Sequence, residues 1–191
     1  MADELELKAV VPDPAALRER LRVAGAEERF RGRMSDRRYD RAGELAGRDE
    51  VLRVRSYHHD GGRVQSVLGW KGPVRRSPEG YKQREELELA TGQSTTATDA
   101  SPHAFLARLG YEPIHAIDRE VEVYSLGGAT VRLERYPRMD PLVEVEGTPA
   151  AIELAIQATG IDRAGFTAES LADFVRRFEA RTGQPALLAD S

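Results

Sequence analysis

Polar and apolar residues alternate with a period of two along most of this 191-residue chain, and this pattern constrains the fold more than any other feature. Successive side chains of a strand point to opposite faces, so each such segment predicts a strand with one apolar and one polar face. The clearest segments are 3–11, 50–57, 62–71, 81–90, 112–125, 128–136 and 141–147, and segment 27–40 is a further candidate. Asp60-Gly61-Gly62 is a turn signal that predicts a hairpin between two of them.

Four helices are predicted, two of them between these strands and two after the last strand. Three begin where a side chain that can cap a helix precedes a proline, at Asp13-Pro14, Ser101-Pro102 and Thr148-Pro149. Each is followed by apolar residues at helical spacing and then by a glycine where the helix would stop. A fourth helix is predicted from Thr167 to near Gly183. With 40% hydrophobic residues, the chain can build one domain over 1–183, and 184–191 is expected to be a flexible tail.

Composition excludes several classes of function. The chain has no cysteine, which rules out disulfides and cysteine-ligated metal sites. Its formal net charge of -4 is unlike that of proteins whose main partner is duplex nucleic acid. No apolar run approaches the roughly 20 residues needed to cross a bilayer, and the charged N-terminal segment lacks an apolar signal core. We therefore expect a cytoplasmic protein with neither a duplex nucleic acid nor a membrane as its partner.

The polar face of the predicted strands is dominated by Glu and Arg. On a single strand, this pattern is typical of the wet face of an open sheet. Its recurrence favours an α+β fold in which a closed eight-stranded antiparallel β-barrel, or tunnel, encloses the charged face and amphipathic helices pack outside. The charged faces carry Glu4, Glu6 and Lys8; Arg53 and Arg55; Arg84, Glu86 and Glu88; Arg132 and Glu134; and Glu144 and Glu146.

A charged lumen has chemical consequences. Buried charges must be paired or must bind ions and ligands. Arginine meets anionic oxygens with a forked set of donors, and glutamate oxygens suit a hard divalent cation. A polyphosphate bound to a divalent metal satisfies both kinds of side chain.

Six short motifs occur in an order that resembles the CYTH family, also called triphosphate tunnel metalloenzymes. This family includes class IV adenylyl cyclases, thiamine triphosphatases and inorganic triphosphatases. The motifs are Glu4-x-Glu6-x-Lys8, Asp36-Arg37-Arg38-Tyr39-Asp40, Leu52-Arg53-Val54-Arg55, Lys71-Gly72-Pro73, Arg84-x-Glu86-x-Glu88 and Glu144-x-Glu146. The resemblance covers roughly residues 3–180, nearly the whole chain.

The resemblance implies a triphosphate inside the tunnel and Mg²⁺ or Mn²⁺ beside it. By this analogy, the triphosphate-binding residues are Lys8, Arg53, Arg55, Lys71, Arg84, Arg119 and Arg132. The metal-binding residues are Glu4, Glu6, Glu86, Glu88, Glu134, Glu144 and Glu146. Catalysis would depend on Glu4, Glu6, Lys8, Arg53, Arg55 and Lys71. Two positions depart from the family pattern, since Val121 replaces a cation and Glu134 an aspartate.

The predicted activity is metal-dependent hydrolysis of the terminal phosphate of inorganic triphosphate or of a nucleoside or organic triphosphate. The same side chains could serve a class IV adenylyl cyclase, which converts ATP to cyclic AMP and pyrophosphate. A third hypothesis is a non-catalytic sensor of polyphosphate or nucleotide. In each case the partner is a small-molecule triphosphate, and the protein is expected to be a monomer or a homodimer.

Overall fold

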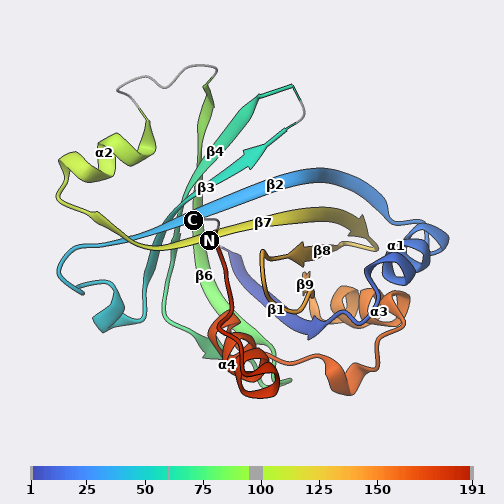
Figure 1. The fold of residues 1–191 in the computed structure, drawn as a ribbon. Helices are drawn as coiled ribbons and strands as arrows, with labels where there is room; N and C mark the ends of the chain where they lie inside the picture. Colours follow the sequence, from blue (N-terminus) through green and yellow to red (C-terminus); the bar gives the residue numbers. More distant parts are fainter. Residues whose placement is uncertain (1, 60, 95–100, 190–191) are drawn as a thin grey trace.

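Eight strands of the chain close into a ring in the computed structural model (Figure 1). The structure describes residues 2–59, 61–94 and 101–189, without the side chains of 2–4 and 92–94. Around the ring the order is β1, β9, β8, β7, β2, β3, β4 and β6, and β6 pairs with β1 to close it. All these pairs are antiparallel. The predicted α+β fold with a closed eight-stranded antiparallel arrangement is therefore confirmed.

The strands match the segments of alternating sequence closely. They are β1 (Ala2–Val10), β2 (Glu27–Asp40), β3 (Val51–His58), β4 (Val64–Lys71), β6 (Lys82–Ser94), β7 (Glu112–Leu126), β8 (Ala129–Arg135) and β9 (Leu142–Glu146). A two-residue strand, β5 (Arg75–Arg76), pairs with β6 outside the ring. The sequence predicted only a loop over 72–80, because two residues are too few to show a period.

Four helices pack outside the ring, namely α1 (Pro14–Val23), α2 (Pro102–Arg108), α3 (Pro149–Thr159) and α4 (Leu171–Thr182) (Figure 1). Two short 3₁₀ turns are η1 (Ala46–Arg48) and η2 (Arg163–Gly165). The expected caps Asp13, Ser101 and Thr148 each accept hydrogen bonds from the first turn of their helix. None of the helices that the structure describes is long and apolar enough to span a bilayer.

The fourth helix begins later than the sequence predicted. Ser170 caps it through a reciprocal arrangement with Asp173. Thr167, the expected start, instead exchanges backbone hydrogen bonds of 2.9 and 2.8 Å with Lys8 of β1. Residues beyond the helix also pack on the ring, since Leu187 pairs with Arg138 and Leu188 adjoins an apolar cluster. The part of 184–191 that the structure describes is therefore hydrogen-bonded to the body of the protein rather than detached from it.

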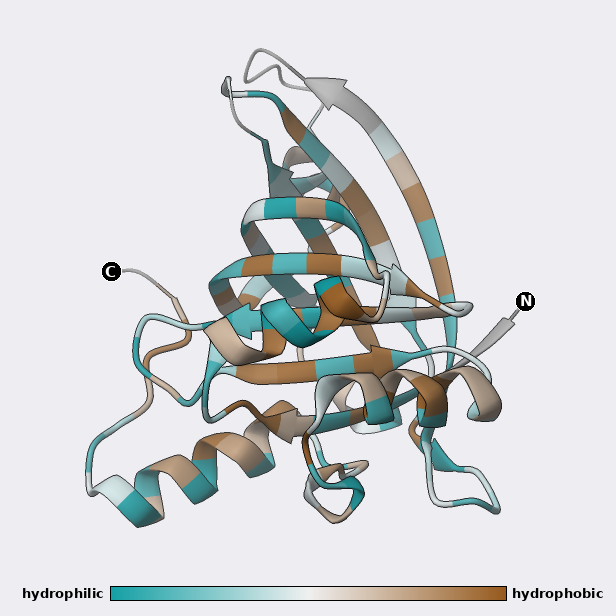
Figure 2. Cartoon of the chain, turned by 90° about the vertical axis from the view of Figure 1, so that its right-hand side faces the viewer, coloured by the Kyte–Doolittle hydropathy of each residue, from teal (hydrophilic) through white to brown (hydrophobic). Residues whose placement is uncertain are grey.

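Most of the apolar core lies between the outer face of the ring and the helices α1, α2 and α3. Its largest cluster joins Leu7, Val131 and Val145 of the strands to Leu21 of α1 and Ile152 of α3. A second cluster lies under α2. A third cluster, under α4, includes Ile117 and Tyr136, which also line the cavity of the ring. Figure 2 shows hydrophobic and hydrophilic residues alternating along the strands. Because the helices cover the outer face, the opposite, charged face is left to line the lumen.

One strand departs from this arrangement. Leu87 and Leu89 of β6 were expected in the core, but they are 49% and 63% exposed. The apolar cluster under α2 extends over Leu52 and Leu68 of the neighbouring strands and does not include the two β6 leucines. The sequence pattern therefore identified the apolar face of β6 correctly, but it did not predict that this face would be left partly exposed.

Candidate active site in the strand ring

The lumen contains a cavity of about 540 Å³ lined largely by charged side chains. Ten of the residues predicted to bind phosphate or metal line it: Glu6, Lys8, Arg53, Arg55, Lys71, Arg84, Arg119, Arg132, Glu134 and Glu144. They come from β1, β3, β4, β6, β7, β8 and β9, so the ring gathers residues far apart in the sequence. Each faces inward because it alternates with a residue of the outer face.

Four predicted site residues are not among the described residues that line this cavity. Glu86 lies beside it and pairs with Lys71, whereas Glu88 is about half exposed and binds Arg53 at 3.0 Å. Glu146 belongs to the acidic cluster at one side of the lumen. The side chain of Glu4 lies outside the described part of the chain, although the backbone of Glu4 pairs with Arg84.

Glu6, Glu144 and Glu146 form a compact acidic cluster. One oxygen from each lies within 4.8 Å of the other two. The register explains this, since Glu6 is opposite Glu146 between β1 and β9 and Glu144 is two residues from Glu146. The three ligands are all carboxylate oxygens, the donor type that a hard divalent cation such as Mg²⁺ or Mn²⁺ requires. The residues therefore fit the metal that the sequence predicts.

Lys8 and Lys82 compensate the negative charge of this cluster. The Lys8 ammonium contacts Glu6 at 2.7 Å and also pairs with Glu144, and Lys82 pairs with Glu6. Burial favours the neutral form of the Glu6 carboxyl, but the nearby lysines outweigh it and lower the pKa of Glu6. The pKa of Glu144 is likewise lowered, against burial, by Lys8 and Arg132. Both carboxylates are therefore held ionised and ready to bind a cation.

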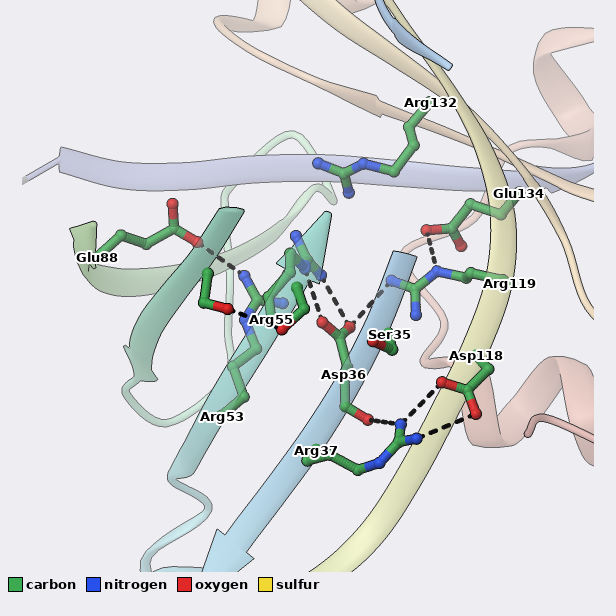
Figure 3. Close-up of polar contacts among 12 residues, drawn as sticks. Ser35, Asp36, Arg37, Arg53, Arg55, Glu88, Asp118, Arg119, Arg132 and Glu134 are labelled. Carbon is green, nitrogen blue, oxygen red and sulfur yellow. Dashed lines mark hydrogen bonds and ion pairs between the residues drawn. The ribbon is translucent and has the colours of Figure 1, made fainter. Parts of the chain in front are cut away.

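Asp36 links two of the arginines across the lumen (Figure 3). Arg55 donates two hydrogen bonds to its carboxylate, at 2.8 and 3.1 Å, and Arg119 donates a third at 3.1 Å. Burial would raise the pKa of Asp36, but Arg55 and Arg119 hold it well below its ordinary value. This contact fixes both guanidinium groups in position.

The two departures from the family pattern lie next to each other. Glu134 accepts hydrogen bonds from Arg119 at 3.0 Å and from the Tyr136 hydroxyl at 2.6 Å. It is not part of the acidic cluster. Val121 lies opposite Glu134 in the β7–β8 register and is buried. Glu134 is therefore a paired carboxylate of the cavity wall, and Val121 beside it is a buried apolar residue.

Three buried arginines retain N–H groups that could bind an anion. The Arg53 Nε, Arg119 Nη1 and Arg132 Nε groups have no hydrogen-bond partner among the described residues. A buried donor without an acceptor is costly, so these groups favour an anionic ligand. Figure 3 shows these three guanidinium groups, with that of Arg55, around the same space. Gly69, opposite Arg53 on β4, leaves room for Arg53, because a Cβ there would lie 3.3 Å from Arg53 Nε.

Sequence reasoning did not assign a role to several lining residues, among them Asp36, Arg38, Lys82 and Tyr136. Lys82 and Tyr136 each lie two positions from a predicted site residue, so strand parity could have identified them. Asp36 and Arg38 lie on β2, whose alternation is less regular because it contains a bulge near Phe30 and an inward-facing Met34. The lining residues of α4 carry no comparable sequence signal.

Comparisons with known proteins support the fold. No protein-family profile matches the chain, and no curated protein matches it. Among solved structures, a candidate adenylate cyclase from Vibrio parahaemolyticus is 17% identical, with a TM-score of 0.69 over 91% of this chain and 97% of that chain. A candidate adenylyl cyclase from Hippeastrum, described as having a dominant triphosphatase activity, is 19% identical, with a TM-score of 0.61 and full coverage of both chains.

A chain of the Schizosaccharomyces pombe Mediator head module is also similar. It is 17% identical, with a TM-score of 0.58 over 83% of this chain and 89% of that chain. At these identities the likeness shows a shared fold, and one fold can carry different functions. The chain has the fold of structures described as adenylate cyclases, which supports the resemblance to the CYTH family.

Proposed function

We propose that this protein is a divalent-metal-dependent triphosphatase of the CYTH type, which hydrolyses the terminal phosphate of inorganic triphosphate or of a nucleoside or organic triphosphate. The observation that carries the proposal is that buried arginines with unpaired N–H groups and a cluster of three carboxylates lie along one lumen. A triphosphate complexed with a divalent cation complements both groups. The fold shared with the Hippeastrum protein supports the same assignment.

The arginines and lysines account for substrate binding. Phosphoryl transfer depends mainly on holding the phosphate chain in line with the attacking oxygen and on neutralising charge on the transferred group. Arg55 and Arg119 are already fixed by Asp36, so they need little reorganisation when an anion binds. Arg53 and Arg132 bring further N–H donors to the same space. These side chains can therefore stabilise charge that develops on the phosphate oxygens.

Glu6, Glu144 and Glu146 are the residues that would hold the metal. A bound divalent cation supplies two kinds of chemistry at such a site, since it neutralises phosphate oxygens and lowers the pKa of a coordinated water. Lys8 pairs with both Glu6 and Glu144, so its ammonium would lie beside a metal held by these carboxylates and could donate to a phosphate oxygen there.

Cyclisation of ATP is the alternative activity, because two of the similar solved structures are described as candidate adenylate or adenylyl cyclases. A cyclase must fix the base and ribose so that the 3′-hydroxyl reaches the first phosphate. Among the described lining residues, Tyr136 is the one Phe, Tyr or Trp side chain, and its hydroxyl is bound to Glu134. Hydrolysis requires only a positioned water, so the lining suits a triphosphatase better.

A paired assay tests the proposal. Purified protein with Mg²⁺ or Mn²⁺ is given tripolyphosphate or ATP, and phosphate release and cyclic AMP are followed together. Phosphate without cyclic AMP, abolished by a chelator and restored by the metal, is the expected result. Cyclic AMP with pyrophosphate would assign the cyclase. Tight triphosphate binding without turnover would assign a sensor.

A further inference from the structure

The outer part of the cavity differs from the charged lumen. It lies where loop 72–80, α4 and the C-terminal segment meet the ring, and apolar side chains form much of its wall. They include Val51, Val74, Leu171, Val175 and Leu188. Leu171, Val175 and Leu188 pack against the cluster under α4 on one side but remain partly exposed on the other. Apolar side chains do not stabilise a bound inorganic triphosphate, because a highly charged anion gains no binding energy from apolar contacts.

Arg38 lies where the apolar part and the charged part join. It faces the cavity from β2, opposite Arg53 in the β2–β3 register and opposite His115 in the β2–β7 register. Arg38 forms no ion pair with a described residue, although most other cations of the lumen do. Burial and the nearby Arg53 and Arg119 lower its pKa, and Asp36 opposes them only in part.

A partly buried guanidinium that Asp36 compensates only in part is repelled by the cations beside it. Its position is best explained by a ligand that brings negative charge to this point. The apolar wall beyond it indicates that the same ligand continues as an organic group. The cavity volume of about 540 Å³ also falls within the range of roughly 300–1,000 Å³ that suits ligands larger than a small anion.

We propose that the substrate is an organic triphosphate, that Arg38 binds the phosphate esterified to its organic group, and that this group contacts Val51, Val175 and Leu188 in the outer cavity. This inference rests on the proposed triphosphatase function and narrows its substrate class. It also orients the substrate, with the organic group at the outer end and the terminal phosphate in the lumen.

The test compares tripolyphosphate with two esters, ATP and butyl triphosphate, in steady-state hydrolysis with Mg²⁺ or Mn²⁺. We expect at least one ester to have a lower KM than tripolyphosphate. Val175→Phe, which narrows the outer cavity, should raise the KM of the better ester by about 10-fold, the size of effect that one apolar contact produces. The KM of tripolyphosphate should change by less than about 2-fold. Val23→Phe, on the exposed face of α1, is the matched control and should change neither.

Arg38→Gln tests the polar contact. It should raise the KM of the ester by about 10-fold or more, and Arg38→Lys should restore part of the affinity. Arg29→Gln, on an exposed part of β2, is the control. Thermal unfolding of each variant shows that the fold is retained.

Two results would overturn the inference while leaving the triphosphatase intact. One is equal or weaker binding of both esters relative to tripolyphosphate. The other is a Val175→Phe or Arg38→Gln variant with unchanged ester kinetics. Failure of the wild-type protein to hydrolyse any of the three compounds would instead reject the proposed function.

Discussion

At the scale of single residues, Glu6 is the side chain on which the proposed chemistry most depends. It belongs to the acidic cluster and contacts both Lys8 and Lys82. Loss of residues that only orient metal ligands costs about 10–100-fold in activity. Loss of a ligand should therefore cost more, and we expect Glu6→Gln to lower kcat/KM by about 100-fold or more.

The fold should survive this change, because glutamine has nearly the same shape as glutamate. The ammonium groups of Lys8 and Lys82 can still be satisfied by other side chains or by solvent. Circular dichroism and thermal unfolding check this point. Glu27→Gln, an exposed change on β2, should leave activity unchanged. Normal turnover in Glu6→Gln would show that the acidic cluster is not the metal site.

Asp36 has a different role, because its carboxylate compensates two buried arginines. Removing one partner of a buried ion pair typically destabilises a protein by about 3–5 kcal/mol. We expect Asp36→Asn to lower the free energy of unfolding by that amount at neutral pH. Asp140→Asn, which breaks a more exposed pair with Arg181, should have a much smaller effect.

The pH dependence of this loss follows from the lowered pKa of Asp36. A carboxyl with a lowered pKa in the folded state stabilises the protein above its unfolded pKa of about 3.9, and this contribution is lost as the pH falls below that value. The difference between wild type and Asp36→Asn should therefore be largest near pH 7 and shrink progressively as the pH falls below about 4. Urea unfolding at several pH values measures it, and a constant difference would contradict the ionic account.

At the scale of elements, helix ends were predictable where they depend on local chemistry. Gly160 ends α3 with a φ of +67°, and a Cβ at this position would overlap the Arg20 side chain of α1. The left-handed conformation alone costs a residue with a side chain about 1–2 kcal/mol. We expect Gly160→Ala to lower the free energy of unfolding by about that amount, as measured in urea. Gly47→Ala is the control, since Gly47 has open space around it and no positive φ.

Features of the elements that depend on distant parts of the chain could not be predicted from the sequence. Period-two alternation identifies which face of a strand is apolar, and it therefore predicted Arg53, Arg55, Arg132 and Glu144 as lumen residues. It contains no information about partners far along the chain. The pairing of Thr167 with Lys8, which delays α4, and the exposure of Leu89 both depend on such partners. The outer cavity was missed for the same reason, since α4 reaches it only through tertiary packing.

At the scale of the whole molecule, the distribution of charge is uneven. The chain has a formal net charge of -4, yet ten Lys or Arg side chains and only five Asp or Glu side chains line the main cavity. A lumen with such an excess of one sign is destabilised by repulsion among its own side chains, and low-dielectric walls strengthen this repulsion. An anion of high charge density relieves the repulsion, whereas the acidic exterior discourages non-specific binding of polyanions elsewhere.

The molecule should therefore be stabilised by tripolyphosphate even without a metal, when turnover is blocked by a chelator. A ligand that binds only the folded state at about 100 times its dissociation constant adds about 2.7 kcal/mol to the free energy of unfolding. Thermal unfolding in increasing tripolyphosphate should show a rising midpoint, and the rise should weaken with added salt, because salt screens the attraction. Sulfate at equal ionic strength should do much less, because it carries less charge and fewer acceptor oxygens than a chain of three linked phosphates. An equal effect of sulfate would mean that the cavity responds to ionic strength alone and does not recognise a chain of linked phosphates.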